Sequence, residues 1–198
     1  MTEHPTLRAL TGLPAEPTSL ADQTLILIDC QNTYTQGVME LDGVQAALDE
    51  AAALLDRARS AGIPIIHIQH DAGPGSPYDV TADIGAIVDR VAPREMEPVV
   101  VKNYPNSFVG TDLDDLLGER QSKNLLLAGF MTHMCVNSTA RGAFSLGYSP
   151  TVVAAATATR PLPALGTEVA SADMQVASLA AMADLFAVVV PDSAALPD

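Results

Sequence analysis

Short apolar runs alternate along this chain with segments of helical spacing, and this alternation constrains the fold more than any other feature. The runs expected to be strands are 24–28, 63–69, 99–101, 125–128, 149–155 and 185–190. The segments expected to be helices are 44–61, 112–120 with Thr111 as N-cap, 135–146 and 167–183. Such alternation predicts a parallel sheet with helices on both faces. We therefore expect a three-layer α/β/α domain with a six-stranded parallel sheet over residues 21–198, after an N-terminal arm over 1–20 that lacks a clear period.

Composition limits the partners and the compartment. The chain has 198 residues and a net charge of −14, so its surface should repel nucleic acid and anionic membranes. We expect no membrane span and no signal peptide, because no apolar stretch has the required length and the N-terminus lacks the required pattern. Two cysteines form no disulfide framework and suggest free thiols in a reducing, cytoplasmic compartment.

Three of the expected strands are followed by a side chain that can react. Asp29 follows the first apolar run, Lys102 follows 99–101, and Cys135 lies shortly after the run that ends near Gly129. Ligands of open α/β sheets bind outside the carboxyl ends of the strands. The order of elements therefore predicts that these three groups meet at one edge of the sheet.

Each group has a chemical interpretation and a plainer one. Cys135 lies near an expected helix N-terminus, which favours the nucleophilic thiolate and offers backbone N–H groups to an oxyanion. Asp29 would act as a base, and Lys102 would stabilise a thiolate or carboxylate by its charge. Alternatively, Cys135 is a small core residue, Asp29 caps a turn and Lys102 is solvated.

The motifs around these residues resemble those of the isochorismatase-like cysteine hydrolases. Asp29 lies in the run Leu27-Ile28-Asp29-Cys30-Gln31-Asn32, Lys102 lies in 101–108, and a Gly-x-x-Thr-x-x-Cys-Val turn extends from Gly129 to Val136. The match covers about residues 25–190, and it implies the isochorismatase-like, Rossmann-like fold. Each motif alone is weak, but their order and spacing together are specific.

The resemblance implies a role for each matching residue. Cys135 would be the nucleophile, Asp29 the general base and Lys102 the electrostatic partner. The backbone amides of Met131 and Cys135 would form the oxyanion hole, and a cis peptide would join Phe130 to Met131. The side chains expected to bind substrate are Gln31, Tyr34, Tyr104, Phe108, Thr132 and His133.

The chain also departs from some members of that family. Members with a metal site, such as nicotinamidases, carry an Asp-x-His pair after the second strand, and this chain has none in 68–76. We therefore expect no metal and no cofactor, although a metal site built from His67, His70, Asp71 and His133 is an alternative. The Asp-Ala pair often found near the fifth strand is absent, and the chain has alanines at 154–156.

These observations favour a cysteine hydrolase that cleaves a C–N bond of a small amide, ureido acid or lactam through a thioester. Isochorismatases proper, which cleave a vinyl ether, typically lack the nucleophilic cysteine, so that activity is the alternative enzyme. A non-catalytic or redox-responsive binding protein on the same fold is the other alternative. We expect a homo-oligomer, a dimer or a tetramer, with contacts from the irregular segment 71–98.

Overall fold

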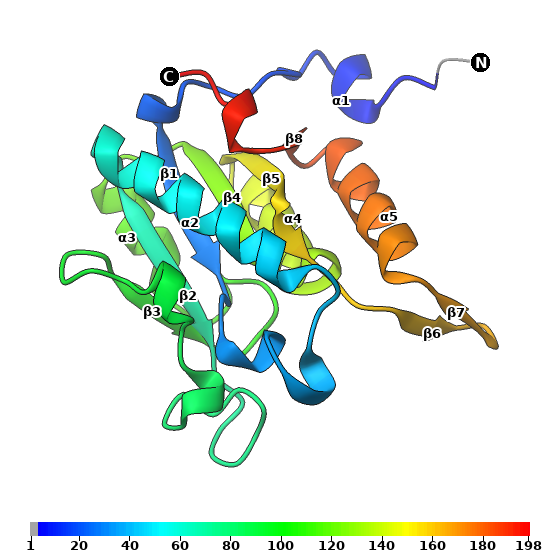
Figure 1. The fold of residues 1–198 in the computed structure, drawn as a ribbon. Helices are drawn as coiled ribbons and strands as arrows, with labels where there is room; N and C mark the ends of the chain where they lie inside the picture. The colour runs from blue at the N-terminus through cyan, green and yellow to red at the C-terminus, as the bar shows by residue number, and fades with distance from the viewer. Residues whose placement is uncertain (1–3) are drawn as a thin grey trace.

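The core of the protein is a six-stranded parallel sheet, as the alternation of elements predicts. The computed structural model describes residues 4–198. The strands of this sheet are β1 (Gln23–Ile28), β2 (Ile65–His70), β3 (Val99–Lys102), β4 (Asn124–Phe130), β5 (Ser149–Ala158) and β8 (Val188–Val190). Their order is β3-β2-β1-β4-β5-β8, and every pair is parallel. All carboxyl ends consequently lie at one edge of the sheet (Figure 1).

Helices cover both faces of this sheet. The helices are α1 (Leu7–Leu10), α2 (Val44–Ala61), α3 (Leu113–Glu119), α4 (Asn137–Ser145) and α5 (Ser171–Ala183). On β1, Leu25 and Leu27 belong to the core with α2, whereas Ile26 and Ile28 belong to the core with α3, α4 and α5. Strands buried on both faces are continuously apolar, which explains the unbroken run in β1. Across residues 4–198, no helix has the length and apolarity needed to cross a bilayer.

The prediction of one helix over 167–183 is wrong in its first part. Residues Leu162–Ala164 form β6 and Thr167–Val169 form β7, an antiparallel hairpin that projects from the body (Figure 1). Its turn residues, Leu165 and Gly166, both have positive φ values of 51° and 80°. This is the backbone of a tight two-residue hairpin turn, so helix α5 begins only at Ser171.

Other boundaries also differ from the prediction. The expected helix at 135–146 is a π-helical turn over Thr132–Val136 followed by α4, so Cys135 precedes the α-helix. The N-cap of α3 is Asp112, while the hydroxyl of Thr111 accepts a long bond of 3.4 Å from the backbone N–H of Leu113. Strand β8 starts at Val188 because the backbone N–H groups of Phe186 and Ala187 are still bonded to Met182 in the turn after α5.

The described part of the N-terminal arm is docked on the body of the protein. Its short helix α1 carries Arg8, whose guanidinium donates to the carbonyl oxygens of Pro14 and Leu185 at 2.6 and 2.9 Å. The backbone N–H of Leu7 donates to the carboxylate of Asp184 at 2.9 Å. These bonds tie the arm to the segment between α5 and β8.

Candidate active site

The carboxyl edge of the sheet brings Asp29, Lys102 and Cys135 into contact. Asp29 follows β1, Lys102 ends β3, and Cys135 lies in the π-helical turn after β4. The Nζ atom of Lys102 lies 2.7 Å from Oδ2 of Asp29 and 3.4 Å from Sγ of Cys135. Asp29 and Lys102 are completely buried, and Cys135 is 5% exposed. The ammonium thus bridges a carboxylate and a thiol inside the protein.

The backbone around Asp29 and Gly129 sets this geometry. Asp29 has φ of 50°, a left-handed conformation that is uncommon for any residue other than glycine. Gly129 has φ of 115° and is the register partner of Ile28, and a Cβ atom at Gly129 would lie 2.0 Å from the carbonyl oxygen of Ile28. Only glycine permits this approach of β4 to β1. The peptide bond between Phe130 and Met131 is cis, as the resemblance implied.

The protonation of the site differs from the prediction of a preformed thiolate. Burial, and then the negative charge of Asp29, raise the pKa of Cys135 to about 12, although Lys102 opposes the rise. Burial also raises the pKa of Asp29, again against the opposing effect of Lys102. Oδ1 of Asp29 has no hydrogen-bond partner among residues 4–198. A neutral thiol therefore lies beside a carboxylate of increased proton affinity, an arrangement suited to base-assisted attack.

Of the six side chains expected to bind substrate, four lie near this centre. Tyr34 is buried, its ring packs edge-on against Phe130, and its hydroxyl donates to that of Tyr78 at 3.2 Å. Thr132 is buried, and its hydroxyl has no partner in the described chain. Nδ1 of His133 is hydrogen-bonded to the hydroxyl of Thr159. The fourth is Gln31, whose buried amide is fully used in holding the backbone of residues 70 and 85.

The other two residues are placed differently. Phe108 stacks on Tyr148 at 5.7 Å and packs against the core that contains α3 and α4. Tyr104 is 59% exposed. Within residues 4–198, the side chains hydrogen-bonded or ion-paired with Lys102 are Asp29, His70 and Cys135, and neither Tyr104 nor Phe108 is among them.

The residues of the alternative metal site are held in separate contacts. His67 is paired with Glu97, while Nδ1 of His70 lies 3.1 Å from Nζ of Lys102. Asp71 accepts a hydrogen bond from the backbone of Gly73, and His133 contacts Thr159 as described above. Within residues 4–198, no three His, Cys, Asp or Glu side chains are grouped as metal ligands would be.

Sequence reasoning did not assign Tyr78 and Arg160 to this region, and it considered His70 only as a ligand of the alternative metal site. The ring of Tyr78 packs edge-on against that of His70, with centroids 4.9 Å apart. Arg160 follows β5. Burial, and then the charge of Arg160, lower the pKa of His133, whereas burial raises the pKa of Tyr78 against the opposing charge of Arg160. His70 lies opposite Lys102 in the pairing of β2 with β3. This register could not be read from the sequence alone, so the contact was not predicted.

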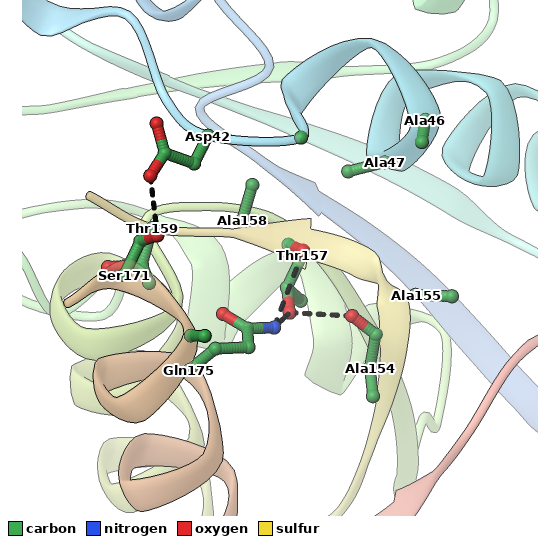
Figure 2. A pocket seen from close by; sticks show the side chains of 12 residues that line it. Asp42, Ala46, Ala47, Ala154, Ala155, Thr157, Ala158, Thr159, Ser171 and Gln175 are labelled. Atoms are coloured by element: carbon green, nitrogen blue, oxygen red, sulfur yellow. Dashed lines mark hydrogen bonds between the residues drawn. The ribbon is translucent and has the colours of Figure 1, made fainter. Parts of the chain in front are cut away.

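A hollow of about 410 Å³ lies between β5 and the first turns of α2 and α5. Figure 2 shows its wall of alanines, which includes Ala154 and Ala155. Its polar groups are Asp42, which accepts from Ser171, and Gln175, which donates to Thr157. Thr159 also lines the hollow and connects it to His133.

Known proteins are similar to this chain in sequence and in fold. The isochorismatase domain model matches residues 23–192. The chain is 32% identical to a secreted isochorismatase effector of Verticillium dahliae, over 92% of this chain and 95% of that protein. It is 31% identical to a ureidoacrylate amidohydrolase of Stutzerimonas stutzeri, over 73% of this chain and 75% of that protein.

A solved structure agrees with these matches. An isochorismatase from Pseudomonas putida KT2440 superposes with a TM-score of 0.94 at 37% identity, over 98% of this chain and 100% of that one. The order of the strands, the residues at their carboxyl ends and these likenesses lead to one conclusion. The chain belongs to the isochorismatase family of hydrolases.

Proposed function

We propose that this protein is a cysteine hydrolase that cleaves the C–N bond of a small amide, ureido compound or lactam through a thioester intermediate. The observation that carries the proposal is the buried Lys102 ammonium in contact with both Asp29 and Cys135. Cys135 is the nucleophile, Asp29 the general base, and Lys102 the fixed positive charge. The chain itself supplies all three groups, so the reaction requires no cofactor.

The chemistry follows from the protonation of the site. Sγ of Cys135 attacks the carbonyl carbon while Asp29 takes the thiol proton, and the backbone N–H groups of Met131 and Cys135 stabilise the oxyanion. The tetrahedral intermediate collapses, the C–N bond breaks, and Asp29 passes its proton to the leaving nitrogen. Water, deprotonated by Asp29, then hydrolyses the acyl-enzyme, and Asp29 returns the proton to the departing thiolate. An amide or lactam yields a carboxylic acid, and a ureido compound yields a carbamic acid.

Relatives support this reaction type. Besides the ureidoacrylate amidohydrolase, they include a streptothricin hydrolase of Streptomyces noursei. The alternatives receive less support from the site. A vinyl ether hydrolase has no use for Cys135 as a nucleophile, and a redox sensor needs a thiol that is exposed and of low pKa, whereas Cys135 is buried and of raised pKa.

A panel of small amides, ureido acids and lactams tests the proposal. The parent protein should release ammonia or amine from at least one member, and Cys135→Ala should not. Hydrolysis of an enol ether such as isochorismate by both proteins, with no amide cleaved, would favour the alternative enzyme. The measurement is an enzyme-coupled ammonia assay, with product identity checked by mass spectrometry.

The charge of Arg160 suggests the kind of substrate. This half-buried guanidinium pairs with no carboxylate within residues 4–198, and its Nε atom has no hydrogen-bond partner there. Arg160 directly follows Thr159, whose hydroxyl is hydrogen-bonded to Nδ1 of His133, two residues before Cys135. An unpaired guanidinium at the site favours substrates that carry a carboxylate.

The variant Arg160→Gln should therefore change selectivity more than chemistry. For 3-ureidopropionic acid we expect kcat/KM to fall about tenfold or more, chiefly through KM, since one charge-assisted contact is lost. The methyl ester of the same compound has no carboxylate and serves as the control, and its kcat/KM should change by less than about threefold. An equal loss for both compounds would contradict the proposed contact.

We also expect the protein to self-associate. Nine of the thirteen residues of helix α5 are apolar, and of its residues only Ser178 and Met182 are buried. Val176 on this helix and Leu165 on the adjacent hairpin are 69% and 106% exposed. Apolar helices are normally covered by other parts of a protein or by a partner.

Light scattering should give at least twice the 20.6 kDa monomer mass at micromolar concentration, and Val176→Glu should lower the mass. A monomer mass for the parent protein would contradict this expectation.

The two cysteines support a reducing compartment such as the cytoplasm. Both Cys30 and Cys135 are free and buried. A cytoplasmic location keeps the nucleophile reduced. Since one relative is a secreted effector, fractionation of cells that express the native protein is the measurement that decides.

A further inference from the structure

The ammonium of Lys102 has three acceptors around it, and the third is not part of the proposed chemistry. Oδ2 of Asp29, Nδ1 of His70 and Sγ of Cys135 lie 2.7, 3.1 and 3.4 Å from Nζ. A lysine ammonium has three N–H donors and no acceptor. Because Lys102 is completely buried, each donor needs a partner inside the protein. The three atoms match the three donors one for one.

His70 is held firmly in the position from which it meets Lys102. It ends β2 and is the register partner of Lys102 on β3. The buried amide of Gln31 accepts from the backbone N–H of His70 and donates to its carbonyl oxygen, both at 2.9 Å. The same amide nitrogen donates to Gly85 at 2.8 Å, and Tyr78 packs against the imidazole. Backbone and ring are therefore fixed from different sides.

The contact also defines the tautomer of His70. Since Nζ only donates, Nδ1 must be unprotonated, and the ring must be neutral with its proton on Nε2. Burial, and then the charge of Lys102, lower the pKa of His70 to about 4, although Asp71 opposes this. Lys102, Asp71 and Tyr78 are the charged or titratable groups that face the ring. The acceptor is therefore available above about pH 4.

We propose that His70 is a positioning residue, whose Nδ1 lone pair holds the Lys102 ammonium between Asp29 and Cys135. Its catalytic meaning depends on the proposed hydrolase function. The contact itself can be tested by the reactivity of the thiol and by the state of the imidazole, and neither measurement needs a substrate. Failure to find a substrate would consequently leave these tests intact.

Two amide variants separate the two nitrogens of the ring. In His70→Asn the side-chain oxygen can occupy the position of Nδ1, whereas in His70→Gln it reaches the position of Nε2. His70→Leu provides neither acceptor. The probe is iodoacetamide, and the rate of Cys135 alkylation is followed by peptide mass spectrometry between pH 6 and 10, which also separates Cys135 from Cys30.

A correctly placed ammonium lowers the pKa of the thiol and so increases the thiolate fraction. We expect His70→Asn to react within about threefold of the parent protein, and the Gln and Leu variants to react about tenfold more slowly below the pH of half-maximal rate. Parent-like rates in all three variants, or a faster Gln than Asn variant, would overturn the proposal. If alkylation of Cys135 were slowed equally in all three variants, His70 would have only a packing role and the proposal would be wrong.

The second test observes the imidazole directly. Long-range proton–nitrogen NMR should show the Nε2–H tautomer of His70 at pH 7, with protonation only near pH 4. In Lys102→Met the charge that opposes protonation is gone, and the midpoint should rise toward the ordinary value of about 6.5. Circular dichroism checks that this variant is folded. A proton on Nδ1 at pH 7 in the parent protein, or an unchanged midpoint in Lys102→Met, would overturn the proposal.

Discussion

Cys135→Ser is expected to abolish turnover, with kcat lower by at least about a thousandfold, while the fold is retained. A hydroxyl is a far weaker nucleophile at the pH where Asp29 can act as its base, and the change is nearly isosteric. The smaller oxygen should still reach Lys102, so we expect the free energy of unfolding to change by less than about 2 kcal/mol. Steady-state kinetics and chemical denaturation measure the two quantities.

The second cysteine provides a matched control for this experiment. Cys30 is also buried and free, but it belongs to the core beside α2, and its sulfur lies 3.9 Å from the carbonyl oxygen of Ile28. Cys30→Ala should cost about 1 kcal/mol of stability and leave turnover unchanged. Full activity of Cys135→Ser would eliminate the covalent mechanism, and inactivity of both variants would show that the assay reports stability instead.

Asp29→Asn is expected to have a comparably large effect on turnover. The loss should already appear in the acylation step, and not only in the later attack by water. The amide retains the shape of the carboxylate but does not take the thiol proton, so single-turnover acylation should fall by at least about a thousandfold. The variant also leaves the buried Lys102 ammonium without its counter-ion. Breaking one side of a buried ion pair costs about 3–5 kcal/mol, which denaturation monitored by circular dichroism will measure.

Substitutions of Lys102 test the role of the positive charge while the proposed base, Asp29, stays in place. Lys102→Arg retains a cation with a larger head and a different geometry, and Lys102→Ala removes the charge. The arginine variant should acylate faster than the alanine variant, although more slowly than the parent protein. If Asp29→Asn acylated at the parent rate, Asp29 would be a structural residue and the mechanism would lack its base.

The sheet and the three reactive residues could be predicted because they depend on local patterns. The strands contain short apolar runs, and parallel strands place their carboxyl ends at one edge. Asp29 and Cys135 closely follow such a strand and Lys102 ends one, so order along the chain was enough to bring them together.

Other features depend on information that no local pattern contains. The partnership of His70 with Lys102 requires the register of β2 against β3. The raised pKa of Cys135 comes from burial and from Asp29, a residue 106 positions away in the sequence, so the expected helix-terminal effect was outweighed. The β6–β7 hairpin was missed because helical spacing in α5 appeared to extend backwards through Thr167.

The close approach of Gly129 to Ile28 has a consequence for engineering of this protein. A mutational library that aims at new substrates should keep position 129 fixed, because even alanine would separate β4, which precedes the proposed nucleophile, from β1, which precedes the proposed base. Gly129→Ala would increase the distance between β4 and β1 without removing any reacting group. Ala154 and Ala155, which line the hollow beside β5 and are at least partly exposed, are by contrast suitable positions to diversify.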